Sequence, residues 1–445
     1  MRSESGEILG AADKRALWHP FTQMRAWCAP EHAPLVLERG RGAVLWDTEG
    51  REYLDGNSSI WTNIHGHCHP HIVAAVRAQL ETLDHVSFLG TSNIPAIRLA
   101  ERLVALFPPG TLERVFYSDN GSTAVEVALK LALQYRQLTG SPRRGYAAFE
   151  MAYHGDTCGA SSVGGVGTFH DRFANLQFDV LRLRDAEDLH RLDPSAAAEL
   201  SAIVIEPLVQ GAAGIRLWPT GMLRELRDWC DANDVLLIFD EVLTGFGRTG
   251  RMFACEHEGV LPDFLALAKG LTGGTLPLAA TLTTERVFAA FLGEFEERKT
   301  FYYGHSYCGN PVACAAAIAN LEIFENESVL ASLPPKTRAL SAALRSLETL
   351  PEVRSTRQIG LIAGIDLARA DGSTPDWREQ TGARVCAAAR EHGLITRPIL
   401  DTVVLMPPLC STEMQIATMG NALKAAIEGI RTATSRAPGS FPLRP

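Results

Sequence analysis

The 445-residue sequence contains no apolar run that reaches the ~18 residues needed to span a membrane. Its first residues also lack the apolar segment of a secretory signal, so we expect neither a membrane span nor a secretion leader. Basic residues are in the minority, with 42 Lys and Arg against 51 Asp and Glu, and the formal net charge is −9. That balance argues against nucleic acid as the main partner.

The nine cysteines are odd in number, scattered along the chain, and include no Cys-x-x-Cys pair. This pattern excludes the disulfide framework of small secreted domains and the paired-cysteine zinc module. We therefore predict free thiols in a reducing cytoplasm. The length and the hydrophobic content of 46% are typical of a globular protein with more than one domain.

Two apolar runs end in polar residues of complementary chemistry. Residues 235–239 are apolar and are followed by Asp240, a pattern typical of a strand buried on both faces of a parallel sheet. Residues 264–268 form a second apolar run, and Lys269 follows it directly. The 29 positions between Asp240 and Lys269 (269 − 240) match one strand-crossover-strand unit, so both side chains are expected at one crevice.

An acid and an amine in one crevice suit pyridoxal phosphate (PLP). This cofactor needs a lysine for its Schiff base and an acid that holds its ring nitrogen protonated. Each residue alone has an ordinary interpretation, because a strand-end Asp is often a helix cap and a lone Lys is usually solvated. The hypothesis of a PLP site therefore rests on the presence of both Asp240 and Lys269.

Two further motifs are ambiguous by themselves. Gly121, Ser122 and Thr123 follow a predicted strand and open a predicted helix, which creates an anion site but is also ordinary capping. The segment 65–71 holds four histidines and one cysteine. Its spacing and its Gly and Pro favour a loop before a helix from His71, and we expect no metal there.

Strands and helices alternate between residues 114 and 325, which predicts a large α/β domain with a mainly parallel sheet. After residue 334 the pattern changes to that of a small α+β domain. The predicted organisation is a disordered N-terminus, an arm with part of the small domain, the large PLP-binding domain, the C-terminal small domain and a disordered tail: 1–15, 16–70, 71–330, 331–431 and 432–445.

The segment 240–250, Asp-Glu-Val-Leu-Thr-Gly-Phe-Gly-Arg-Thr-Gly, and the segment 262–274 that contains Lys269 resemble the class III aminotransferases. The resemblance covers residues 17–430. It implies the PLP-dependent fold type I, with a seven-stranded sheet, a small domain built from both chain ends, and a homodimer with shared sites. The cofactor-binding residues that it implies are Gly121, Ser122, Tyr153, Glu206, Asp240, Val242, Lys269, His305 and Ser306.

Within this class, the chain is most similar to the aminotransferases that convert 8-amino-7-oxononanoate to 7,8-diaminononanoate in biotin synthesis. The segments 18–24, 58–66, 153–157 and 397–408 carry that similarity. It implies catalytic roles for Lys269, Asp240 and Tyr153. The substrate-binding residues that it implies are Phe21, Ile60, Trp61, Tyr153, Lys269, Gly304 and Arg397.

Two positions depart from the relatives that take their amino group from S-adenosylmethionine. Phe21 stands where they have tyrosine, and Ile60 stands where they have a second tryptophan. The donor therefore stays open between S-adenosylmethionine and lysine. Another class III ω-aminotransferase, acting on a diamine, γ-aminobutyrate or an amino alcohol, is the alternative enzyme. A PLP-binding protein without turnover is the alternative outside catalysis.

Overall fold

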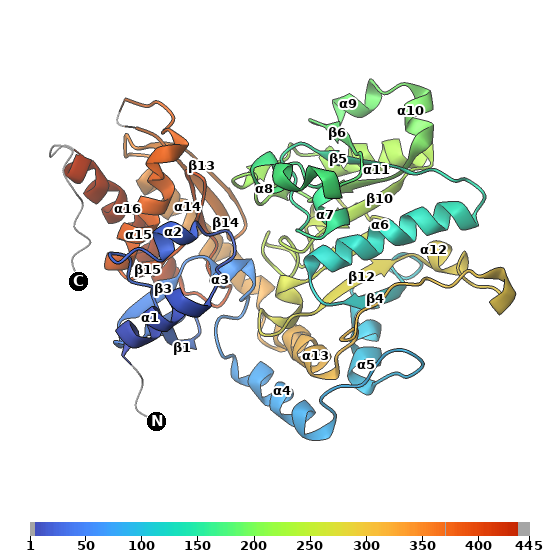
Figure 1. Ribbon diagram of the computed structural model, residues 1–445, viewed down its shortest axis with the longest axis horizontal. Coiled ribbons are helices and arrows are strands. Elements are labelled where there is room, and N and C mark those ends of the chain that lie inside the picture. The colour runs from blue at the N-terminus through green and yellow to red at the C-terminus, as the bar shows by residue number, and fades with distance from the viewer. Residues whose placement is uncertain (1–4, 370, 435–445) are drawn as a thin grey trace.

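A computed structural model describes residues 5–369 and 371–434. The chain forms two lobes (Figure 1), one built from the middle of the chain and one that contains both ends. The larger lobe is organised around a seven-stranded sheet. In spatial order, its strands are β4 (Arg114–Ser118), β12 (Ala279–Thr283), β11 (Phe264–Leu267), β10 (Leu236–Asp240), β7 (Leu200–Ile205), β5 (Gly145–Phe149) and β6 (Leu181–Leu183).

The large sheet is parallel except at β12, which runs antiparallel to both of its neighbours. Every residue of β7, β10 and β11 is buried. This explains why their sequences are continuous apolar runs rather than alternating ones. The mainly parallel α/β fold predicted from the sequence is confirmed.

Helices cover the sheet in the large lobe, and α6 packs against β11 and β12 while α13 packs against α4 and α5. The helices of this lobe are α4 (Pro70–Thr82), α5 (Ile94–Val104), α6 (Gly121–Leu138), α7 (Cys158–Val163), α8 (Gly167–His170), α9 (Glu187–His190), α10 (Pro194–Glu199), α11 (Met222–Asn233), α12 (Glu285–Ala289) and α13 (Pro311–Asn326). The helix predicted from His71 is therefore present as α4.

The small lobe joins the two ends of the chain. The antiparallel strands β1 (Leu37–Arg41), β2 (Val44–Asp47) and β3 (Glu52–Asp55) form one sheet with β15 (Leu394–Ile395), which pairs parallel to β3. A second sheet contains β13 (Val353–Ile359), β14 (Ile362–Leu367), β17 (Thr402–Leu405) and β16 (Pro398–Ile399), and a two-stranded sheet contains β8 (Val209–Gln210) and β9 (Arg216–Leu217). The helices are α1 (Gly6–Ala16), α2 (Met24–Trp27), α3 (Ser58–Trp61), α14 (Leu333–Leu347), α15 (Thr381–Glu391) and α16 (Glu413–Thr434).

The predicted disorder of residues 1–15 is wrong for the part that the structure describes. Helix α1 occupies Gly6–Ala16, and the Ser5 side chain caps it by accepting from the Ile8 amide. Asp13 on this helix accepts hydrogen bonds from Trp27 (2.6 Å) and from His19 (2.9 Å). These contacts with the following arm stabilise a helix that local propensity alone does not predict.

The predicted tail also begins too early, because α16 continues to Thr434. The remainder of that prediction, 435–445, lies outside the described residues, as do residues 1–4. Within 5–369 and 371–434, no helix is both long and apolar enough to cross a membrane.

Candidate active site

The two polar strand ends predicted from the sequence meet in one cavity. Strand β10 pairs with β11 in parallel, with Asp240 in register with Ala266. Asp240 and Lys269 both line a cavity of about 450 Å³. Lys269 lies two residues after the end of β11 and has a left-handed backbone (φ 41°). Burial lowers the pKa of the Lys269 amine, an effect that the nearby carboxylates of Asp240 and Glu206 oppose.

Asp240 is buried and held on both sides. Its Oδ2 accepts from Nδ1 of His154 at 2.8 Å, and its Oδ1 accepts from the Val242 amide at 3.0 Å. His154 is itself buried, and its Nε2 has no hydrogen-bond partner among the described residues. His154 is not among the site residues that the sequence predicts. Its only sequence signal is its place beside Tyr153, 86 positions before Asp240.

The amino end of α6 opens into the same cavity through Gly121 and Ser122. The Asn120 side chain caps the helix by accepting from the Thr123 amide, and the Thr123 hydroxyl accepts from the Asn120 amide, so the amides of Gly121 and Ser122 are the ones left for a ligand. A Cβ at Gly121 would lie 2.7 Å from Cγ1 of Val242, and this close approach requires glycine. Free amides and the helix dipole make this end a site for an anion.

Tyr153 lines the same cavity. Its hydroxyl donates to Oδ2 of Asp156 at 2.8 Å, and its ring stacks on His170 with centroids 5.8 Å apart. Burial and the adjacent Asp156 raise the pKa of the Tyr153 hydroxyl, so it stays a hydrogen-bond donor at neutral pH. Asp156 was not among the residues predicted from the sequence.

Glu206 closes another side of the cavity. Its carboxylate accepts from the Tyr153 amide at 3.0 Å and from the Gly211 amide at 2.8 Å. Burial raises the pKa of Glu206 to about 7, so this group exchanges a proton close to neutral pH. The structure therefore brings Glu206 together with Lys269, Asp240 and Tyr153, as predicted from the resemblance.

Trp61 forms the wall that the small lobe contributes. Its indole centroid lies 5.2 Å from Nζ of Lys269, and its ring nitrogen donates to Oδ1 of Asn57 at 3.0 Å. Trp61 packs in a buried apolar cluster with Val404 and Met406. An amine, an acid pair, an anion site and an apolar wall therefore surround one cavity.

Arg397, Phe21 and Ile60 do not line the cavity in this single chain. Arg397 is exposed, but its carbonyl accepts from the amide of Val404, which packs with Trp61. Phe21 lies edge-on to Phe169 with centroids 5.4 Å apart, and Phe169 lies edge-on to Tyr153. Ile60 is 43% exposed. Phe21 therefore connects to the cavity lining through Phe169, and the Arg397 backbone connects to it through Val404 and Trp61.

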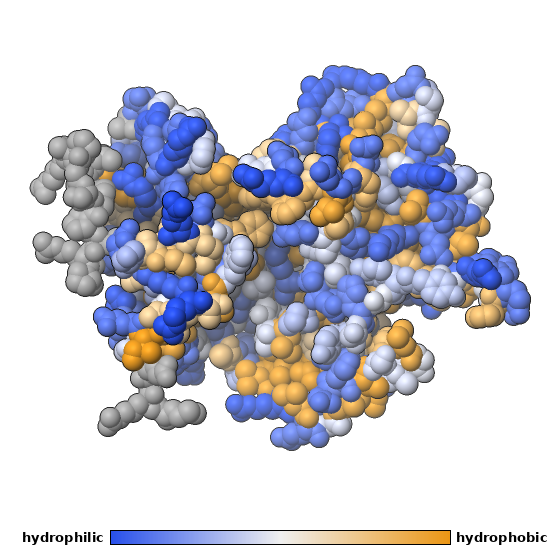
Figure 2. Space-filling view, viewed as in Figure 1, coloured by the Kyte–Doolittle hydropathy of each residue, from blue (hydrophilic) through white to orange (hydrophobic). Residues whose placement is uncertain are grey.

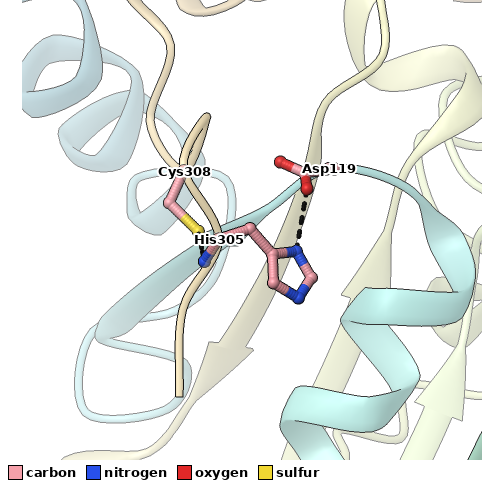
Figure 3. Close-up of side chains that lie close together, drawn as sticks. All are labelled: Asp119, His305 and Cys308. Atoms are coloured by element: carbon pink, nitrogen blue, oxygen red, sulfur yellow. Dashed lines mark hydrogen bonds and ion pairs between the residues drawn. The ribbon is translucent and has the colours of Figure 1, made fainter. Parts of the chain in front are cut away.

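Gly304, His305 and Ser306 also lie outside the cavity lining. Gly304 and Ser306 are exposed, whereas Nδ1 of His305 bonds to Asp119, a residue that does line the cavity (Figure 3). His305, Asp119 and Cys308 offer potential metal ligands within 4.8 Å of one another. However, burial raises the pKa of the Cys308 thiol, which disfavours the thiolate that a metal requires. The His305 amide also donates to the Cys308 sulfur, so the cluster is satisfied internally.

The geometry agrees with the comparisons to known proteins. The family profile described as aminotransferase class III matches residues 27–427. The chain belongs to the class III aminotransferases. It is therefore an aminotransferase with the fold type I architecture, as the resemblance implied.

Individual relatives cover almost the whole chain. A relative from Geobacter sulfurreducens, named adenosylmethionine-8-amino-7-oxononanoate aminotransferase, is 46% identical over 94% of this chain and 97% of its own. The crystal structure of the enzyme of that name from Methanocaldococcus jannaschii superposes with a TM-score of 0.92, at 40% identity over 96% of this chain and 99% of its own. An amine transaminase from an uncultivated Pseudomonas species, solved in a PLP-bound form, superposes with a TM-score of 0.85 at 34% identity, over 96% and 100% of the two chains.

Proposed function

We propose that this aminotransferase binds PLP in the cavity between Lys269 and the amino end of α6. The residues fit such a group, because Lys269 offers an amine for the aldehyde and Asp240 offers an anion for the ring nitrogen. The free amides of Gly121 and Ser122 suit the phosphate, and Val242 and Tyr153 stand beside the space for the ring. The observation that carries the proposal is this convergence of amine, acid and anion site in one cavity.

When bound, PLP supplies an electron sink that stabilises negative charge at the carbon next to the substrate nitrogen. The protein supplies the proton carrier, which we assign to the Lys269 amine. Its lowered pKa increases the neutral fraction that can accept a proton. Hydrogen bonds from His154 and from the Val242 amide, one to each oxygen, hold the Asp240 carboxylate in one orientation. Trp61 excludes water from one side of the amine.

We assign the acceptor substrate as 8-amino-7-oxononanoate and the product as 7,8-diaminononanoate, a step of biotin synthesis. The names of the relatives support this assignment. The chain's own residues also support it, because an apolar cluster of Trp61, Val404 and Met406 adjoins the exposed Arg397. An alkyl chain against Trp61, the member of the cluster that lines the cavity, would leave its distal carboxylate for a guanidinium such as that of Arg397 to bind.

The amino donor is S-adenosylmethionine or lysine. Phe21 has no hydroxyl to donate, and Ile60 has no ring for a sulfonium to lie against. Stopped-flow absorbance of the PLP-loaded protein with each donor tests both donor and function. We expect one of the two donors to bleach the visible cofactor band, and 8-amino-7-oxononanoate to restore it. Bleaching by a diamine or γ-aminobutyrate but by neither proposed donor would favour the alternative ω-aminotransferase.

We propose further that the active unit is a homodimer, in which Gly304, His305 and Ser306 reach the partner's site. Gly304 and Ser306 are exposed in the single chain. Figure 2 shows apolar surface around α4 and α5, where several large apolar residues are exposed. These residues are Leu80, Leu83, Leu89, Ile94 and Ile97. Burying such a surface against a second copy would stabilise the pair.

Mixing two inactive variants tests the shared sites. Lys269→Ala removes the amine, and Ser306→Glu adds a negative charge where the partner's phosphate would bind. In a hybrid dimer, one site regains an intact Lys269 from one chain and an intact Ser306 from the other. We expect about half of the wild-type activity per hybrid. Hybrids that form and stay inactive would contradict the proposal.

The free state of all nine cysteines supports the proposed cytoplasmic location.

A further inference from the structure

Residues 56–63, called the Trp61 loop here, include the short helix α3, whose backbone is not helical at Ser59 and Ile60. Ser58, Ser59 and Trp61 have φ values of 46°, 61° and 67°, in the left-handed region that residues with a Cβ rarely adopt. Conformations of this kind persist only where the surrounding structure fixes them. The Trp61 loop is therefore held in a backbone conformation that its own residues disfavour.

The Asp55 carboxylate holds this loop. It is fully buried at the end of β3, where it accepts from the Asn57 amide at 3.1 Å and from the Ser59 amide at 2.8 Å. A second contact fixes the other side, because the Ser58 hydroxyl donates to the Met406 carbonyl at 2.7 Å. The backbone between β3 and Trp61 is therefore tied at three successive residues, 57–59.

His67 holds Asp55 in turn. Its Nε2 lies 2.9 Å from Oδ2 of Asp55, the oxygen that also receives the Ser59 amide. Its Nδ1 lies 3.5 Å from the Asn63 side-chain nitrogen, so His67 donates through Nε2 and accepts through Nδ1. Its backbone forms two hydrogen bonds with Gly42, in the turn between β1 and β2. The small N-terminal sheet thereby fixes the position of the imidazole.

The other three histidines of the segment 65–71 each have a partner of their own. His65 packs against Phe324, while His71 bonds to Glu322 at 2.7 Å and His69 lies 3.5 Å from Glu327. The four rings have separate partners rather than one common centre. Among them, His67 is the one that bonds to the carboxylate of the Trp61 loop.

We propose that His67 and Asp55 are positioning residues that fix the Trp61 loop and so keep the indole against the Lys269 amine. Asn57 links the two ends of this chain of contacts, because its amide bonds to Asp55 and its side chain bonds to the Trp61 ring nitrogen. Neither His67 nor Asp55 lines the cavity, so both act through the loop. The consequence for substrate rests on the proposed function, in which Trp61 walls the acceptor site.

The test compares His67→Phe with His67→Gln in the full-length protein. Phenylalanine fills the space without a donor, whereas the glutamine amide can place a donor near the position of Nε2. Hydrogen–deuterium exchange of the peptide that covers 57–63 is the first readout, because it requires neither cofactor nor substrate. We expect exchange in this peptide to accelerate about tenfold in His67→Phe and to stay near wild type in His67→Gln. Peptides from β10 and β11 should exchange at the wild-type rate in both variants.

The second readout is kinetic. We expect His67→Phe to raise KM for 8-amino-7-oxononanoate about tenfold, with labelling of Lys269 by PLP and borohydride intact. Unchanged exchange over 57–63 in His67→Phe would overturn the proposal, whatever the substrate proves to be. If His67→Phe unfolds, Asn63→Ala replaces it and is measured against Thr62→Val, because Asn63→Ala removes both the contact to Nδ1 of His67 and the hydrogen bond from the Thr62 hydroxyl, whereas Thr62→Val keeps the contact to Nδ1. An acceleration of about threefold over 57–63 would then support the proposal, and wild-type exchange would overturn it.

Discussion

Removing the guanidinium of Arg397 should weaken the half-reaction with 8-amino-7-oxononanoate and leave the half-reaction with the amino donor nearly unchanged. Its side chain is exposed and forms no hydrogen bond or ion pair with another described residue. Arg397→Ala should therefore change the free energy of unfolding by no more than about 0.5 kcal/mol. The residue is free to bind a carboxylate, and a charged hydrogen bond of this kind contributes about 2–3 kcal/mol.

That energy predicts a specific pattern in stopped-flow measurements. The apparent Kd of 8-amino-7-oxononanoate should rise about 30- to 150-fold in Arg397→Ala. The half-reaction with an amino donor that lacks a matching distal carboxylate should change by less than about threefold. Arg390→Ala is a matched control, because Arg390 is exposed on α15 and has no assigned role. Equal losses in both half-reactions, or a loss in neither, would refute Arg397 as the carboxylate anchor.

Two further predictions concern the buried carboxylates of the cavity. Asp240→Asn should keep PLP bound but lower kcat by about 10²–10⁴, because the ring nitrogen loses its anion; near-normal kcat would reduce Asp240 to a structural role. Glu206 has a folded-state pKa of about 7, above its ordinary value of 4.5, so the folded protein loses stability as pH rises from 4.5 through 7. In the protein without cofactor, the stability of Glu206→Gln relative to wild type should therefore increase between pH 5 and pH 8 by up to about 3 kcal/mol. Thermal unfolding across this range measures the difference, and a pH-independent difference would contradict the assigned pKa.

The sequence was sufficient for features that depend on local pattern. The apolar runs that end in Asp240 and Lys269 predicted buried neighbouring strands, and β10 and β11 confirm them. The Gly-Ser-Thr motif predicted a helix start, and α6 begins at Gly121. In each case a run of a few neighbouring residues determines the type of secondary structure and the position of the polar residue at its end.

Features that depend on distant contacts were missed. His154 bonds to Asp240 across 86 positions, and Asp119 bonds to His305 across 186. No periodicity or spacing encodes such pairs, since they arise only when parallel strands and loops meet at one edge of the sheet. Helix α1 was missed for the same reason, because its stabilising partners, His19 and Trp27, lie in the following arm.

Borohydride reduction of the PLP-loaded protein, followed by peptide mapping, tests the central claim most directly. Lys269 is the one lysine that lines the described cavity beside Asp240, and its amine is desolvated by burial. We predict that the pyridoxyl group is found on Lys269, and that Lys269→Ala takes up no label. A pyridoxyl group on any other lysine of the wild-type protein would contradict the assignment of this cavity as the active site.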